Sequence, residues 1–174
     1  MDAFFEILRI ILPATAVFVA AYLIVKGFLD NEQKRREQEY RKAGQASITP
    51  LRLQAYERVV ILLERTNPNT LIVRVNKQGF TVHQLHLELI KTIKGEYEHN
   101  LSQQIYMSYG AWELVKNAKE EIIKLINISA TKVPHDAPGN DLAMMILNVT
   151  ANLGKKLPND IAIEFIKKEV NQSF

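Results

Sequence analysis

Four titratable side chains on one short stretch could together bind a metal ion: His83, His86, Glu96 and His99. Glu96 and His99 have the i, i+3 spacing that carboxylate-bridged di-iron bundles use, but such a bundle needs this pair twice and two further glutamates on facing helices. The chain holds one copy, and it lacks the H-E-x-x-H spacing of zinc peptidases. A metal-dependent enzyme using this cluster is therefore the alternative hypothesis, against histidines on a helix surface or in local hydrogen bonds.

No other motif indicates a reaction. The stretch LGKKLP lacks the upstream glycine and the hydroxyl residue of a phosphate-binding loop, and neither GxGxxG nor GxSxG occurs. The absence of cysteine excludes disulfides, thiolate metal ligands and a cysteine nucleophile. We predict no cofactor and no catalytic residue, and the sequence leaves the substrate, if there is one, unknown.

The most distinctive run, EYEHNLSQQIYMSYGAW, combines amide and aromatic side chains where two helices should meet. Such groups can join two helices, or they can present a contact patch, because rigid aromatic residues dominate protein interfaces. The sequence favours the first use and leaves the second open. The candidate helix-junction or interaction residues are Asn100, Ser102, Gln103, Gln104, Tyr106, Tyr109 and Trp112.

Apolar residues at helical spacing predict an all-α domain over residues 48–174. Thr49 and Pro50 suit a helix start, Thr81 caps a second long helix, and another begins near Ser108. PHDAPGN is the clearest loop, and two shorter helices follow it. The stretch from Leu71 to Val75 is too short and too β-branched to be assigned to helix or strand.

An apolar run near the N-terminus predicts a transmembrane helix at residues 10–29. Sixteen uncharged residues extend from Ile10 to Val25, and about twenty helical residues span roughly 30 Å, the thickness of a bilayer core. Lys26 lies near one end, where its long side chain can reach the headgroups. The alternatives are a cleaved signal peptide, which lacks its usual positive start and cleavage site here, and a buried core helix.

A charged segment, residues 30–47, should continue this helix as a stalk that ends in a flexible AGQAS break. The basic residues gather on this side, so we expect residues 1–9 outside and the C-terminal domain in the cytoplasm, with a periplasmic domain as the alternative. Contact with an anionic lipid surface is expected of Lys26, Lys34, Arg35, Arg36, Arg41 and Lys42.

Three stretches, LQAYERVVILLERTNP, EYEHNLSQQIYMSYGAW and KEEIIKLIN, lie behind the single predicted span. In these the sequence resembles a Bacteroidota family of small single-span membrane proteins with a helical domain of unknown function. The likeness covers nearly the whole chain. It implies a helical domain at the cytoplasmic side of a bacterial inner membrane, and it implies no activity, cofactor or catalytic residue.

Together these patterns predict an interaction or scaffold module rather than an enzyme. The expected partners are the lipid bilayer and either another protein or a second copy of the chain. The net charge of +3, with both signs interleaved, gives little reason to expect nucleic acid.

Overall fold

The computed structural model describes the backbone of residues 2–173 and the side chains of that range except 2–10, 12–14, 43 and 173. The described part of the chain is all-helical, as the spacing of its apolar residues predicts, with an isolated β-bridge between Thr81 and Pro138. The elements are α1 (Asp2–Thr66), α2 (Pro68–Val75), α3 (Val82–His99), the 3-10 helix η1 (Leu101–Tyr106), α4 (Tyr109–Ala130), α5 (Gly139–Ala151) and α6 (Pro158–Ser173).

The chain divides into two compact units, Met1–Thr49 and Pro50–Phe174. The first unit consists of the N-terminal part of α1, and the second contains the remaining helices together with the last turns of α1. The tail, stalk and domain boundaries expected at residues 1–9, 30–47 and 48–174 stay predictions.

The predicted membrane span at residues 10–29 is contradicted. Among the described residues, no helix combines the length and the apolar character that crossing a bilayer requires. Residues 10 and 12–14 of the predicted span lie outside the described side chains. The predicted single-pass topology and inner-membrane location depended on this span, so they are contradicted as well.

The charged segment of α1 is helical, but the flexible break predicted at AGQAS is wrong. Glu32 accepts a hydrogen bond from Arg36 at 3.4 Å, as the i, i+4 spacing predicts, and a second ion pair joins Arg35 to Glu39 at 3.1 Å. The helix passes through AGQAS and Pro50 without a break. Pro50 has no N–H for the carbonyl one turn earlier, so α1 lacks one backbone hydrogen bond at this boundary. The cations expected at a lipid surface are exposed, and their contact with lipid stays a prediction.

Local capping explains where the next helices begin. Asn67 accepts from the N–H of Asn69 and Pro68 occupies the first turn, so residues 71–75, left open between helix and strand, are helical in α2. Thr81 and Gln84 form a reciprocal capping box at the start of α3. Ser108 caps α4 by accepting from the N–H of residue 111 at 3.1 Å. The starts of α3 and α4 are as the sequence predicts, whereas the start of α2 was not predicted.

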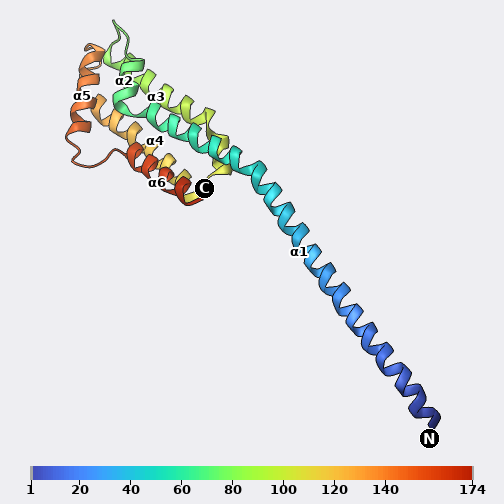
Figure 1. Ribbon diagram of the computed structural model, residues 1–174. Coiled ribbons are helices and arrows are strands. Elements are labelled where there is room, and N and C mark those ends of the chain that lie inside the picture. The colour runs from blue at the N-terminus through green and yellow to red at the C-terminus, as the bar shows by residue number, and fades with distance from the viewer. Residues whose placement is uncertain (1, 174) are drawn as a thin grey trace. The chain divides into compact units, whose positions relative to one another are not determined.

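Two apolar cores lie in the unit Pro50–Phe174, and α4 contributes to both of them. Figure 1 shows α4 beside α3 and α6 in this unit. The first half of α4, including Trp112 and Val115, packs against the end of α1 and against α6. The second half, including Ile122 and Ile126, packs against α2, α3 and α5. Because its buried side chains recur every three or four residues over its whole length, α4 can serve both cores.

Candidate functional site at a helix junction

The histidines of the suspected metal cluster are spread along α3 and engaged separately. The ring of His86 bonds the side-chain oxygen of Asn127 through Nε2 at 2.7 Å, and His99 bonds a backbone carbonyl one turn earlier at 2.8 Å. His83 stacks edge-on with His135, with 5.9 Å between ring centroids. Within the described residues, no group of three or more His, Cys, Asp or Glu side chains is placed to hold a metal ion.

Glu96, the carboxylate of that cluster, is occupied by two arginines from other helices. Its Oε1 accepts from Arg65 Nη2 at 2.7 Å and from Arg74 Nη1 at 3.0 Å. Arg74 also donates to the backbone carbonyl of Arg65 at 3.1 Å. Glu96 therefore joins α1, α2 and α3 at their surface, and the structure gives the metal-enzyme alternative no support.

The amide residues of the distinctive run form the turn between α3 and α4. Asn100 ends α3, and its side-chain nitrogen donates to the carbonyl of Glu96 at 2.8 Å. Gln103 is buried and donates to Ser102 Oγ at 3.2 Å, whereas Gln104 is exposed. This part of the run builds η1, a helix that the sequence did not predict.

The aromatic residues of the run have three different roles. Trp112 is buried and stacks on Tyr97, with 5.5 Å between ring centroids. Tyr106 offers its backbone carbonyl to Arg52 Nε at 3.2 Å. Tyr109 is 81% exposed. Helix joining and surface display thus occur at different residues of the same run.

A polar network at this junction ties the end of α1 to α4 and α6. Tyr56 donates its hydroxyl hydrogen to Glu169 and accepts from Arg52 Nη2 at 3.3 Å. The same carboxylate accepts from the backbone N–H of Ser108 at 3.2 Å and from its hydroxyl. One carboxylate therefore holds the start of α4 and the inner side of α1 together.

The two acids of this network, Tyr56 and Glu169, have the protonation states that its hydrogen bonds require. Burial, followed by the hydrogen bond to Glu169, raises the pKa of Tyr56 above its ordinary 10.0, so its hydroxyl remains a donor. Burial alone would raise the pKa of Glu169, but the hydrogen bonds from Ser108 and Tyr56, with the charge of Arg52, lower it below 4.5. Glu169 is therefore an acceptor at neutral pH.

The contacts of this arrangement join helices. The Ser108 oxygen caps α4 while its hydrogen goes to Glu169, so neither is free for a substrate. The sequence marked Ser108 as a helix start, but it did not connect this residue with Tyr56. The available signal was Glu169 itself, a carboxylate in α6 between the apolar residues Ile166 and Val170.

The network predicts a loss of stability in acid. Because the folded pKa of Glu169 is depressed, its contribution is fully present above pH 4.5 and is lost as the pH falls from there through the folded pKa. We expect Glu169→Gln to lower the free energy of unfolding at pH 7 by about 1–2 kcal/mol, since a charge-assisted acceptor is lost. Urea unfolding between pH 7 and 3 should show a shallower acid decline for this variant; an unchanged decline would contradict the role of Glu169.

An apolar groove lies beside the network, between the last turns of α1 and α6, with a volume of about 500 Å³. Its walls include Val60, Ile166 and Val170, and its mouth exposes Leu53 and Ile61 at 49% and 48% of their surfaces. Two exposed charges of opposite sign also line the groove, and within the described residues neither forms a salt bridge or a side-chain hydrogen bond. They are Glu57 and Lys167.

The fold and the site define an all-helical protein whose polar clusters join helices and whose described side chains form no metal centre. The chain belongs to a family of unknown function, DUF7935, whose family model matches residues 2–173. No curated protein and no solved structure matches the chain.

Proposed function

We propose that this protein is an interaction module that associates with a second copy of itself through the groove between α1 and α6. The observation that carries the proposal is the pairing of exposed apolar residues with two unpaired, opposite charges in that one groove. The expected Bacteroidota origin of the family, which the resemblance implies, stays a prediction.

The apolar part of the groove supplies the driving force. Leu53 and Ile61 lie two turns apart on α1 and are each about half exposed, while their neighbours Tyr56 and Val60 line the groove wall. Removing apolar surface from water contributes about 25 cal/mol per Å². A helix pair from another copy, laid along this groove, covers both residues and places the two grooves face to face.

The charges select a second copy as the partner. In a two-fold symmetric interface the same surface faces itself, so Glu57 of each copy can meet Lys167 of the partner. One interface then forms two ion pairs from side chains that have none within the described part of a single copy. A groove of one sign would repel its own copy; this groove is complementary to itself.

Charge reversal tests the proposal. We expect Glu57→Lys or Lys167→Glu alone to raise the dimer dissociation constant at least tenfold, because like charges then meet twice. The double variant E57K/K167E restores both pairs with reversed polarity and should return within about threefold of the unmodified chain. Sedimentation velocity of the full chain across a concentration series measures these constants.

The controls separate the groove from other apolar surfaces. Leu53→Glu should abolish association, whereas Leu87→Glu, at an equally exposed leucine of α3, should leave it unchanged. Association through the exposed apolar residues of 15–29 would be indifferent to charges at positions 57 and 167. A monomeric wild-type chain, or a double variant that associates as weakly as the single ones, rules the groove dimer out.

A further inference from the structure

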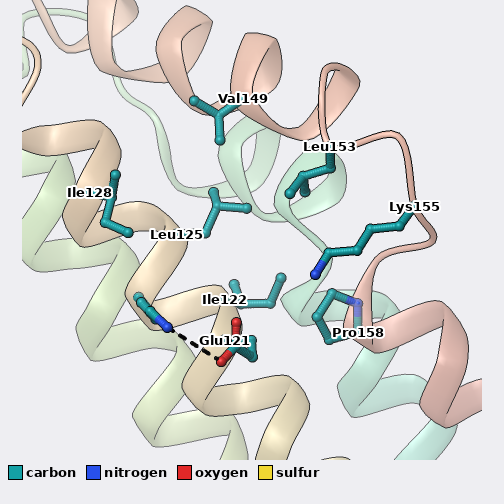
Figure 2. Close-up of a pocket in the computed structure, with 9 residues that line it drawn as sticks. Glu121, Ile122, Leu125, Ile128, Val149, Leu153, Lys155 and Pro158 are labelled. Atoms are coloured by element: carbon teal, nitrogen blue, oxygen red, sulfur yellow. Dashed lines mark ion pairs between the residues drawn. The ribbon is translucent and has the colours of Figure 1, made fainter.

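We infer that a second cavity, between α4, α5 and the loop before α6, binds a small carboxylate with an apolar tail. The cavity has a volume of about 150 Å³ and is separate from the groove of the proposed dimer. Figure 2 shows its lining side chains converging from these three segments.

The wall of this cavity is apolar. Ile122 and Leu125 come from α4, Val149 from α5 and Leu153 from the loop, and in Figure 2 they surround one space. An apolar cavity of about 150 Å³ is large enough for a benzene-sized molecule. The tail of a ligand of about six carbon atoms fits this size and this chemistry.

A glycine turn brings a cation to the same cavity. Gly154 has a φ of +61°, a left-handed conformation that side chains disfavour, and it reverses the chain after α5. As a result both of its neighbours, Leu153 and Lys155, line the cavity. Figure 2 shows the Lys155 side chain directed from the loop toward the apolar wall.

The ammonium of Lys155 has no ion pair or side-chain hydrogen bond within the described residues, unlike that of Lys156, which bonds Glu164. The other charges at the rim are Lys124 and Glu121, which pair with each other at 3.8 Å. Two cations and one anion leave the cavity with one uncompensated positive charge. One carboxylate balances it, so the ligand class is a monocarboxylate rather than a neutral or cationic amphiphile.

Titration of the full chain with hexanoate, 1-hexanol and hexylammonium tests this site by methyl NMR. Hexanoate should shift the methyl groups of Ile122, Leu125, Val149 and Leu153 and should bind about tenfold more tightly than hexanol, since only the carboxylate meets Lys155. Hexylammonium should bind most weakly. Equal affinities for the three, or hexanoate shifts that avoid these methyl groups, would overturn the inference.

Substitutions test the apolar wall and the Lys155 ammonium of the site separately. Lys155→Met should reduce hexanoate affinity about tenfold and leave hexanol unchanged, while Lys156→Met, the matched control, should alter neither. Leu153→Trp should fill the cavity and abolish both, with folding checked by the unshifted methyl groups of the other core. Hexanoate binding that survives Leu153→Trp, or that ignores Lys155→Met, contradicts the proposed site.

Discussion

Replacing Trp112 with alanine should lower the free energy of unfolding by about 3–5 kcal/mol, the usual cost of removing a buried aromatic side chain. Trp112 is only 6% exposed and lies in the core formed by the end of α1, the first half of α4 and α6. It also stacks on Tyr97, whose ring additionally lies 4.3 Å from the ammonium of Lys119. Chemical denaturation measures the loss.

Tyr109→Ala is the matched control for that experiment, because Tyr109 belongs to the same sequence run and is almost fully exposed. Its effect on the free energy of unfolding should stay within about 0.5 kcal/mol. If both variants were equally stable, the run would be a surface patch throughout. The expected contrast assigns helix joining to Trp112 and leaves exposed residues such as Tyr109 and Gln104 available for contact.

Asn159→Asp should be the most damaging of the conservative substitutions, with a loss of about 3 kcal/mol or more. Asn159 is 1% exposed at the start of α6, and its side-chain nitrogen donates to the carbonyl of Leu63 at 2.6 Å and to Thr66 Oγ1 at 3.1 Å. A carboxylate here turns the donor into a second acceptor and buries a charge beside a carbonyl oxygen.

Two comparisons separate the lost hydrogen bonds from the buried charge. Asn159→Ala removes the bonds alone and should cost about 1–3 kcal/mol. Asn69→Asp makes the same chemical change at an exposed position in the first turn of α2, where a negative charge is tolerated, and should be nearly neutral. Thermal unfolding at pH 7 ranks the three, and an Asn159→Asp variant as stable as Asn69→Asp would show that Asn159 does not tie α6 to α1.

The predictions from sequence were wrong where a local pattern was used to infer a property that depends on a longer segment of the chain. The apolar residues near the N-terminus predicted a membrane span, but no helix among the described residues has the length and apolar character for one. Thr49 and Pro50 predicted a helix start, and α1 continues through both because one missing backbone hydrogen bond does not end a helix that its neighbours sustain.

The suspected metal cluster shows the same limit in three dimensions. His83, Glu96 and His99 share one helix, but their partners come from elsewhere or from the local backbone: His135 for the first, Arg65 and Arg74 for the second. Spacing along a helix establishes which side chains share a face. It does not establish which residues of other segments will contact those side chains.

What the sequence determined by itself is local: the all-helical character, the caps at Thr81 and Ser108, and the apolar face of α4. Capping and periodicity depend on neighbours within a few positions, so they can be seen in one dimension. The tertiary structure alone decided that Glu169 meets Tyr56, 113 positions away, and that Lys155 faces an apolar cavity. These contacts depend on how the helices of the second unit pack, because only that packing brings distant side chains within hydrogen-bonding range.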